Sequence, residues 1–355
     1  MTDDAQMKAG PDVDRIANAA WVNRRGFVRQ LALAGTAGLF RLVPREASAE
    51  RPPESPRLRL TQTPVLCVAP QYVASELLRA EGFVDLQYVK RDGDFQQWQR
   101  QALASGEVDI MTSYVTTFVT HIDAGDPIVL LGGVHVGCYE LFGTDKVRAI
   151  RDLRGRRVAV FESRSAQELF VSMMAAHVGL DPAKDIEWVI RPAAEQSTLL
   201  AERKVDAVMA FPPEAQELRA KKIGHVVVAS AIDRPWSQYF CCMIAGNKEF
   251  VRRNPVATKR AVRAILKASM MCATEPERAA RLLVDRGFAR NYDYTLQMLK
   301  DLPYNRWREL DPSDAVRFYA LRLREFGLIK GDPKKIIAQG TDWRFLNELK
   351  KELKG

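Results

Sequence analysis

Three consecutive residues, Ser163, Arg164 and Ser165, carry side chains that could hold a small ligand. They stand at the start of a helix expected over residues 165–178, where free backbone N–H groups and the helix dipole favour an anionic or carbonyl group. An ordinary helix cap is the alternative, because Ser163 or Ser165 with Glu168 also makes a capping box. The two interpretations are compatible, and both predict a helix start here.

Hydroxyl groups and one carboxylate form two further candidate contacts. Ser113, Tyr114 and Thr116, in an expected loop over residues 112–117, can donate and accept hydrogen bonds, although such residues also cap helices. Glu214, three residues after Phe211, could hold a ligand amine or could merely favour the first turn of its helix. A buried carboxylate needs a partner, so a Glu214 that lines the site predicts a ligand with a cationic or N–H-bearing end toward it.

Aromatic side chains could wall the same site, although aromatic residues beside apolar runs more often pack in a core. Gln62 and Thr63 follow the first expected strand and complete the set. No catalytic residue is predicted. The predicted ligand-binding residues are Gln62, Thr63, Tyr72, Ser113, Tyr114, Thr116, Ser163, Arg164, Ser165, Phe211, Glu214 and Tyr239.

The elements that would position these residues alternate between strand and helix, which predicts parallel sheets covered by helices. In such sheets, ligands bind beyond the carboxyl ends of the strands, and this rule selects the polar segments named above. The expected strands cover residues 58–61, 85–90, 108–111, 127–142, 157–161, 186–190, 207–210 and 225–229. The expected helices cover residues 71–81, 95–105, 165–178, 193–203, 213–221, 255–274, 277–286, 292–299 and 312–326.

The two halves of this alternation resemble each other. Glu-Val-Asp-Ile-Met at 107–111 matches Lys-Val-Asp-Ala-Val-Met at 204–209, since in both a helix ends, Val-Asp turns the chain and a buried strand follows. Helix-to-strand turns are short and stereotyped, so a single match is weak. Both matches come third in a strand–helix series, which favours two related α/β blocks.

The cysteines and histidines predict neither a disulfide framework nor a metal site. The five cysteines are an odd number and none is spaced as Cys-x-x-Cys. Most stand in apolar runs, where a free cysteine behaves as a small buried hydrophobe. We expect the four histidines to stay isolated from one another and from cysteines and carboxylates at metal-ligand spacing, so no zinc site is predicted. We therefore expect the cysteines to pack in the core, with no metal and no cofactor.

Composition and motifs exclude several function classes. The formal net charge is +9, but the basic residues are scattered, without the basic stripe and interleaved aromatics that nucleic-acid binding needs. The sequence has no G-x-S-x-G elbow, no H-E-x-x-H, no Walker-type glycine loop and no G-x-G-x-x-G. No nucleic-acid partner is expected, and the common hydrolase, kinase and dehydrogenase classes lack support.

The N-terminal segment has the parts of a removable twin-arginine export signal. Arg24 and Arg25 precede a weakly apolar stretch at 31–40 and a small-x-small site, Ala-Ser-Ala, at 47–49. The stretch is too short for a membrane helix, which takes roughly 20 apolar residues. We expect cleavage after residue 49 and a periplasmic mature chain that begins near Glu50 and has already folded in the cytosol.

Two segments resemble sequences of a known family. Asp-Leu-Arg-Gly-Arg-Arg-Val-Ala-Val at 152–160 resembles the crossover into the second lobe of solute-binding proteins of ABC importers, and Gly-Glu-Val-Asp at 106–109 resembles their turn before a strand. From about residue 57 to about residue 260 the chain is similar to the nitrate/sulfonate/taurine and thiamine-pyrimidine branch. Sulfonate and taurine binders usually have Gly-Ser where this chain has Glu-Ser-Arg-Ser at 162–165, and many relatives have an aromatic residue and Pro-Tyr where it has Phe-Pro-Pro-Glu at 211–214. The substrate therefore does not transfer.

The resemblance implies an α/β, two-lobed type II periplasmic binding protein that closes on a small polar or anionic organic solute by hinge bending. Its implied partners are the permease and ATPase subunits of an importer, and we expect a monomer. Two alternatives stay open: a ligand-loaded partner of a sensor receptor, and an enzyme like the yeast-type thiamine-pyrimidine synthases. The Cys-Cys-Cys-Phe-Cys segment of those enzymes is partly matched by Tyr-Phe-Cys-Cys at 239–242.

The remaining chain of roughly 300 residues is long enough for two domains. We expect a linker at 50–57, lobe 1 at 58–143 and lobe 2 at 144–242. Residues 243–355 should return to lobe 1 and add a helical C-terminal tail, which packs on the first lobe because that sheet is otherwise left uncovered.

Overall fold

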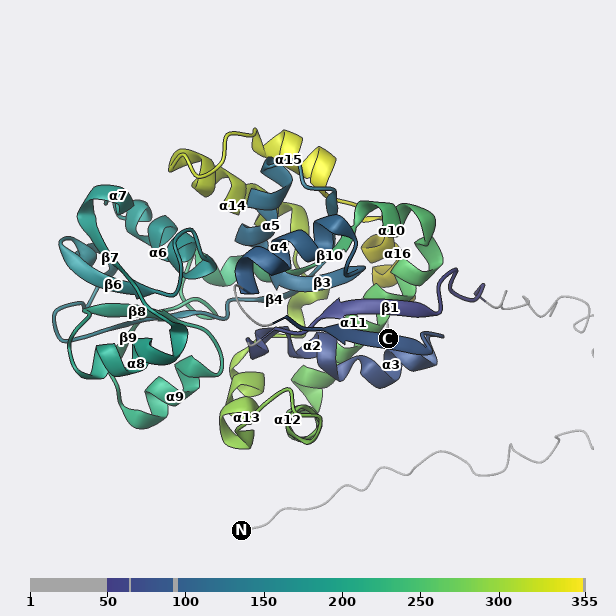
Figure 1. Cartoon of the computed structure of the whole chain (residues 1–355), viewed down its shortest axis with the longest axis horizontal. Coiled ribbons are helices and arrows are strands. Elements are labelled where there is room, and N and C mark those ends of the chain that lie inside the picture. The colour runs from purple at the N-terminus through teal and green to yellow at the C-terminus, as the bar shows by residue number, and fades with distance from the viewer. Residues whose placement is uncertain (1–49, 64, 92–94, 354–355) are drawn as a thin grey trace, which may run out of the picture. The chain divides into compact units, whose positions relative to one another are not determined.

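The computed structural model describes residues 50–63, 65–91 and 95–353. The predicted export signal at 1–49 lies outside the described residues. Within the described part of the chain, two mixed sheets carry the fold (Figure 1). The first sheet has the order β2 (Asp85–Val89), β1 (Arg57–Thr61), β3 (Ile110–Tyr114), β10 (Phe240–Asn247) and β4 (Ile128–Val136). The second has the order β7 (Ile186–Ile190), β6 (Arg156–Val160), β8 (Ala207–Ala210), β5 (Glu140–Gly143) and β9 (His225–Ala229).

The two sheets repeat one topology. In the first, β1 runs parallel to β2 and β3, and β10 lies antiparallel between β3 and β4. In the second, β6 runs parallel to β7 and β8, and β5 lies antiparallel between β8 and β9. The α/β class predicted from the alternation is confirmed, as are the two lobes that the family resemblance implies, although both sheets are mixed and not purely parallel as expected.

Helices cover both faces of each sheet. Those that follow strands of the first sheet are η1 (Leu66–Val68), α2 (Ala69–Val73), α3 (Ser75–Ala80), α4 (Phe95–Ser105) and α5 (Val115–Asp123). Those of the second are η2 (Ile150–Leu153), α6 (Ala166–His177), α7 (Pro182–Asp185), α8 (Ala193–Ala201), α9 (Glu214–Lys221) and η3 (Trp236–Gln238). Figure 1 shows α6 and α7 on one face of the second sheet and α8 and α9 on the other.

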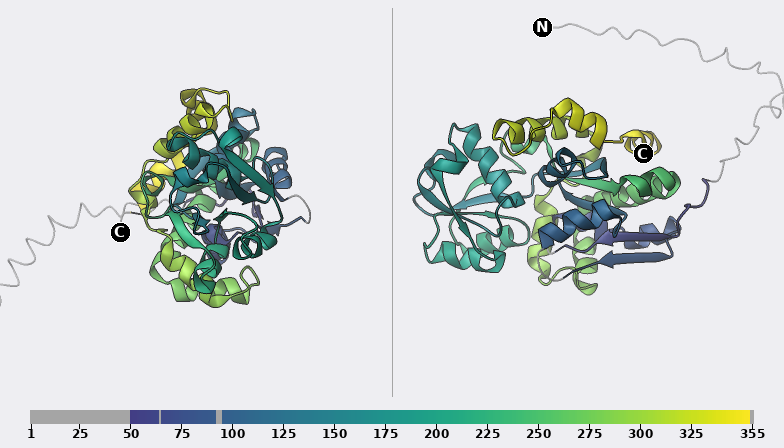
Figure 2. Two further views of the ribbon diagram at one scale, coloured as in Figure 1. Left: turned by 90° about the vertical axis from the view of Figure 1, so that its left-hand side faces the viewer. Right: turned by 45° about the horizontal axis from the view of Figure 1, so that its top comes forward.

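The C-terminal third is helical and packs on the first sheet's layers, as predicted. It comprises α10 (Lys248–Arg253), α11 (Pro255–Thr274), α12 (Pro276–Asp285), α13 (Tyr292–Asp301), η4 (Arg306–Arg308), α14 (Pro312–Glu325), α15 (Pro333–Gly340) and α16 (Arg344–Glu352). Helix α11 contacts α2 and α3, whereas α14 and α15 contact α5, beside which they appear in yellow in Figure 2. None of the helices in residues 50–63, 65–91 and 95–353 has the length and hydrophobicity to cross a membrane.

The duplicated Val-Asp turn has one structural role in both sheets. Asp109 accepts a hydrogen bond from the backbone N–H of Arg59 at 2.8 Å and pairs with the Arg59 guanidinium. Asp206 accepts from the backbone N–H of Arg157 at 3.1 Å and faces the Arg157 Nε at 3.5 Å. Each aspartate therefore ties the start of its own strand to the neighbouring central strand, which explains why the same residue recurs.

Two expectations about local structure are wrong. The expected loop at 112–117 does not exist, because residues 112–114 end β3 and α5 begins directly at Val115. A Thr-Ser-Tyr run suits a buried strand as well as a loop, and all five residues of β3 are buried. The expected strand region at 127–142 is two strands in different sheets, β4 and β5.

The break between β4 and β5 falls at Gly137. Its φ of +41° is unfavourable for other residues, and a Cβ there would lie 2.3 Å from the backbone nitrogen of Ala231. The chain enters the second sheet by Glu140 and is back in the first at Phe240, a few residues before the expected limits at 143 and 242. The division into lobes is otherwise still a prediction.

Candidate ligand-binding site

A cavity of about 520 Å³ lies at the carboxyl ends of the parallel strands and is lined from both sheets. From the first sheet's side come Thr63, Val65, Val68, Gln99, Thr112, Ser113 and Tyr114, and from the second sheet's side come Phe161, Glu162, Gln167, Pro192, Ala193, Phe211, Pro212, Pro213 and Glu214. This location is where ligands bind in open α/β sheets. No lysine, arginine or histidine is among the described residues that line it.

Two contacts join the halves of the cavity lining. The ring of Tyr114, at the end of β3, lies 4.7 Å from the ring of Phe211, which follows β8. The backbone N–H of Leu66 donates to the carbonyl of Pro212 at 3.2 Å. Both Tyr114 and Phe211 are nearly inaccessible to solvent, so they give the cavity an apolar, aromatic wall.

Five of the predicted residues line this cavity: Thr63, Ser113, Tyr114, Phe211 and Glu214. Tyr72 lies behind the lining, where its hydroxyl accepts a hydrogen bond from the Thr63 N–H at 2.7 Å and its ring stacks on Phe288. Gln62 also stays outside the lining, and its N–H donates to the carbonyl of Val89. Tyr72 thus positions a lining residue from within the core.

The other predicted residues lie elsewhere. Ser165 is buried and caps α6, since its hydroxyl accepts from the Glu168 N–H at 3.3 Å. Ser163 and Arg164 line a separate cavity of about 570 Å³ beside α5 and residues 327–330. Thr116 is fully buried in α5, and Tyr239 stacks on Phe318 at 4.0 Å. The anion-binding helix start predicted at 163–165 therefore does not face the cavity between the sheets.

Sequence reasoning missed two lining glutamines. Gln167 accepts a hydrogen bond from the Phe161 N–H at 2.8 Å and donates to the Met209 carbonyl at 2.7 Å. Gln99 faces Ser113, with the hydroxyl 3.5 Å from its Oε1. Glutamines inside helices carry no motif, but the internal repeat could have found Gln167, because Gln71 has the matching place in the first block.

Glu214 is a carboxyl group of the cavity lining whose pKa is raised by its surroundings. Burial raises the pKa of its carboxyl to about 8, and the Glu217 carboxylate acts in the same direction. Its Oε1 is shielded from solvent and has no hydrogen-bond partner in the described part of the chain. With a pKa of about 8 the carboxyl is mostly protonated at pH 7, and in that form it can donate a hydrogen bond as well as accept one.

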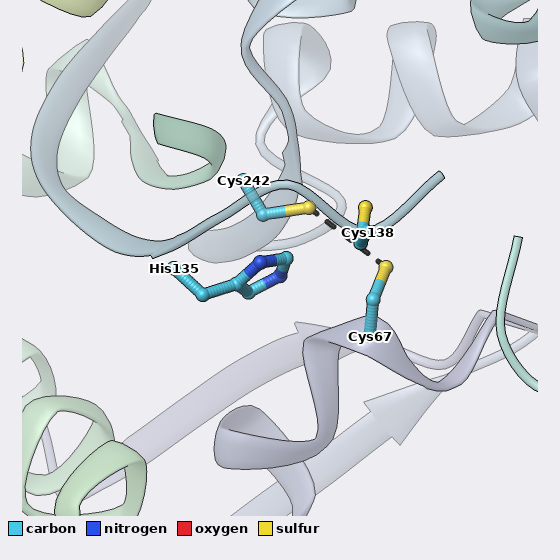
Figure 3. Close-up of side chains that lie close together, drawn as sticks. All are labelled: Cys67, His135, Cys138 and Cys242. Carbon is cyan, nitrogen blue, oxygen red and sulfur yellow. Dashed lines mark hydrogen bonds between the residues drawn. The ribbon is translucent and has the colours of Figure 1, made fainter. Parts of the chain in front are cut away.

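The expectation that the histidines are isolated from cysteines at metal-ligand spacing is wrong, because only two residues separate His135 from Cys138. His135 meets Cys67, Cys138 and Cys242 in the core, with one ligand atom of each within 4.8 Å of the others (Figure 3). All five cysteines are buried, as expected for core residues. Burial raises the pKa of the Cys67 thiol to about 11.

Comparison with known proteins identifies the family. A family model described as NMT1/THI5 like matches residues 68–279, which is more than half of the chain. The chain belongs to the NMT1/THI5-like family. No sequence among the curated proteins matches it.

Solved structures share the fold of this NMT1/THI5-like chain at low sequence identity. The periplasmic nitrate-binding protein NrtA from Synechocystis PCC 6803 is 15% identical, with a TM-score of 0.72 over 86% of this chain and 90% of its own. The alkanesulfonate-binding protein SsuA from Xanthomonas axonopodis pv. citri, bound to MOPS, is 15% identical, with a TM-score of 0.66 over 82% and 99%. A Candida albicans protein described as having the generic periplasmic binding protein fold is 15% identical, with a TM-score of 0.64 over 81% and 96%.

Proposed function

We propose that this protein is the periplasmic solute-binding component of an ABC importer and captures a small polar organic solute between its two sheets. The observation that carries the proposal is the cavity of about 520 Å³ lined by both sheets at the carboxyl ends of their strands. Family membership and the likeness to nitrate- and sulfonate-binding proteins support the same role. The permease and ATPase subunits of the importer are the proposed partners, and the protein is proposed to act as a monomer.

The cavity lining favours a ligand without a compact negative charge. Glu162 and Glu214 are the charged or ionisable residues among its described members, and the other polar groups are neutral hydroxyls and amides. A neutral Glu214 carboxyl can donate to one ligand atom while it accepts from the next. We therefore favour a solute with adjacent acceptor and N–H groups, such as an amide or a nitrogen heterocycle, whose apolar part packs on Tyr114 and Phe211.

A binding screen tests the role and the ligand class together. Thermal unfolding of the full chain is measured with pyrimidines, amides, amino-acid derivatives, aromatic carboxylates, alkanesulfonates and nitrate, and hits are confirmed by calorimetry. A ligand that binds the folded chain raises its Tm. For the best ligand we expect Glu214→Leu to weaken binding by about 1–3 kcal/mol, because leucine removes both the donor and the acceptor of the neutral carboxyl. The matched control is Glu195→Leu, at an exposed residue of α8, which should leave affinity unchanged.

Two results would contradict the proposal. One is the absence of any Tm shift across all solute classes. The other is chemical turnover of a bound solute, in particular stoichiometric iron with loss of a bound pyridoxal group, which would favour a synthase. Export by the twin-arginine route is tested separately, by replacing Arg24 and Arg25 with lysine and comparing the periplasmic and cytosolic amounts. If the lysine variant accumulated in the periplasm as the wild type does, export by the twin-arginine route would be ruled out, and the binding proposal would be unaffected.

A further inference from the structure

Four side chains that commonly bind metals meet beside Tyr114, a residue of the cavity lining, and each comes from a different segment (Figure 3). Cys67 lies in η1, His135 in β4 and Cys242 in β10, whereas Cys138 lies in the connection from β4 to β5. All four are buried, with exposed fractions of 3% or less. None of the four is among the described residues that line the solute cavity.

The strand register explains how two of the ligands come together. Cys242 of β10 pairs with His135 of β4 on one side and with Tyr114 of β3 on the other. The β10–β4 ladder has register shifts on both sides of Cys242. Such irregularities redirect side chains locally, and here two neighbouring strands send a thiol and an imidazole into one site.

The sulfur positions suit tetrahedral coordination. The Sγ atoms of Cys67 and Cys242 are 3.8 Å apart. Two thiolates bound to one tetrahedral zinc at about 2.3 Å stand about 3.8 Å from each other. The remaining ligand atoms lie within 4.8 Å of one another, so small side-chain rotations are enough to complete the shell.

His135 supplies the observation that core packing alone leaves unexplained. Its Nδ1 lies 3.2 Å from the carbonyl oxygen of Val136, a contact that favours the tautomer with hydrogen on Nδ1. Its Nε2 is buried and has no hydrogen-bond partner among the residues that the structure describes. Buried polar atoms rarely stay unpaired. A histidine held through one nitrogen by a backbone carbonyl, with the other nitrogen free, is the usual arrangement of a metal ligand.

We propose that Cys67, His135, Cys138 and Cys242 bind one Zn²⁺ ion in a closed, structural site. Three thiols lose their protons to solvent when the ion binds, and the neutral imidazole keeps its own, so the loaded site carries one net negative charge. The Cys67 thiol donates toward the Tyr114 hydroxyl at 3.9 Å, and once the thiol is a metal-bound thiolate the same hydroxyl can donate to it instead. Four protein ligands leave no open position, which distinguishes a structural zinc from a catalytic one.

The ion would fasten the place where the chain passes between the sheets. Cys138 lies on the outgoing connection, and Cys242 lies two residues into the strand that returns. Of the four proposed ligands, only Cys242 belongs to the Tyr-Phe-Cys-Cys segment at 239–242, so that segment does not reveal the ligand set. Cys241 could compete with the zinc ion for Cys138, because the two sulfurs are 2.9 Å apart. A disulfide between them would remove one of the four ligands. Export of the folded chain would let zinc bind in the reducing cytosol first.

The test uses the full chain, made in the cytosol, freed of any histidine tag and purified with a reductant that does not bind metal. We expect about one zinc per chain by elemental analysis. Exchange for Co²⁺ should give the strong visible bands of tetrahedral thiolate-bound cobalt, and chelation should lower Tm by about 4 °C or more. Cys67→Ser and Cys242→Ser should each reduce bound zinc at least about tenfold.

Two controls keep the test decisive if the ligand variants fold poorly. Cys272→Ser changes a buried cysteine of α11 outside the cluster and should retain zinc and cobalt bands. Cys241→Ser removes the competing thiol and should also retain them. The proposal is overturned if the folded wild type binds neither Zn²⁺ nor Co²⁺ under reduction. It is equally overturned if freshly purified protein has a Cys138–Cys241 disulfide, or if the cysteine ligand variants bind as much zinc as the wild type.

Discussion

Gln167 occupies in the second sheet the place that Gln71 occupies in the first. Gln71 donates to the carbonyl of Thr61 at 2.7 Å and accepts from the N–H of Thr112 at 2.8 Å, so it bridges β1 and β3. Gln167 bridges β6 and β8 with the roles of its amide groups exchanged between the two strands. In both sheets the central parallel strands separate at their carboxyl ends, and a glutamine amide satisfies the backbone groups that this leaves unpaired.

The repeated glutamines predict losses of stability at both positions and unequal effects on binding. Gln71→Leu and Gln167→Leu each leave a buried N–H and a buried carbonyl without their partner, which costs about 1–3 kcal/mol of unfolding free energy. Gln167→Leu should cost the more of the two, because it also removes a partner of the buried Gln196 amide. Only Gln167 lines the cavity, so only Gln167→Leu should also weaken solute binding. Denaturant unfolding and calorimetry on both variants check this. If Gln71→Leu and Gln167→Leu lost equal affinity for the solute, the prediction would be contradicted, and a change in either sheet would disturb the cavity.

The paired aspartates give a second prediction on the same repeat. Asp109 accepts from the Arg59 backbone and forms a close ion pair with its guanidinium at 2.6 Å, whereas Arg157 faces Asp206 at 3.5 Å. Asp109→Asn should therefore reduce the unfolding free energy more than Asp206→Asn, by about 1–2 kcal/mol. The comparison needs only urea unfolding of the two variants at one pH. If Asp206→Asn lost more unfolding free energy than Asp109→Asn, the ion pair would not decide the loss, and the backbone hydrogen bond that both aspartates accept would.

Local patterns in the sequence predicted most of the elements. The expected strands at 186–190, 207–210 and 225–229 and the helix at 255–274 have the bounds found in the structure. These segments are read correctly because apolar alternation and Pro or Gly boundaries are local properties. The sheet that β5 joins is not local, since it depends on pairing with β8 and β9 far along the chain.

The site was less predictable for the same reason. The rule about carboxyl ends selected Thr63, Ser113 and Glu214, which line the cavity, because the rule follows from strand order alone. It also selected Ser165, which lies outside the lining and caps α6. Cys67 and Cys242 are 175 residues apart in sequence, so no spacing rule could bring their sulfurs together.

The crossing between the sheets should be intolerant of a side chain at Gly137. Gly137 and Gly155 both have positive φ, +41° and +68°, but a Cβ at Gly155 meets no atom within 4 Å. Gly155→Ala should cost about 1 kcal/mol, the backbone penalty alone. Gly137→Ala adds a clash with the backbone of Ala231 and should cost at least about 3 kcal/mol. Similar midpoints in urea for the two variants would contradict this account.

Arg219 is expected to stabilise the arrangement of the two sheets seen in the structure. It lies on α9 beside the second sheet and pairs with Asp301 of α13, a helix that packs with the first sheet's helices, and with Glu140 at 3.2 Å. The pairs are partly exposed, so Arg219→Met should change solute affinity by only about 2- to 10-fold. Arg278→Met, which breaks a pair within one helix turn, is the matched control and should change nothing. If both variants bound the solute equally well, Arg219 would have no part in stabilising this arrangement of the two sheets.

Glu214 should make both stability and binding depend on pH. Its pKa in the folded chain is about 8, against an ordinary value of 4.5, so the unfolded chain ionises first as pH rises. The neutral carboxyl therefore makes its full contribution to the unfolding free energy below about pH 4.5. This contribution falls progressively as the pH rises and is lost once the pH passes 8. The unfolding free energy should fall more between pH 5 and pH 9 in the wild type than in Glu214→Gln. The other carboxyl groups, including Glu217, titrate in both proteins and contribute the same pH dependence to each. Solute affinity should fall above pH 8 in the wild type alone, because only the neutral acid can donate a hydrogen bond. Identical pH profiles in the two proteins would show that Glu214 is ionised in the folded chain and that the ligand must instead bring a cation to it.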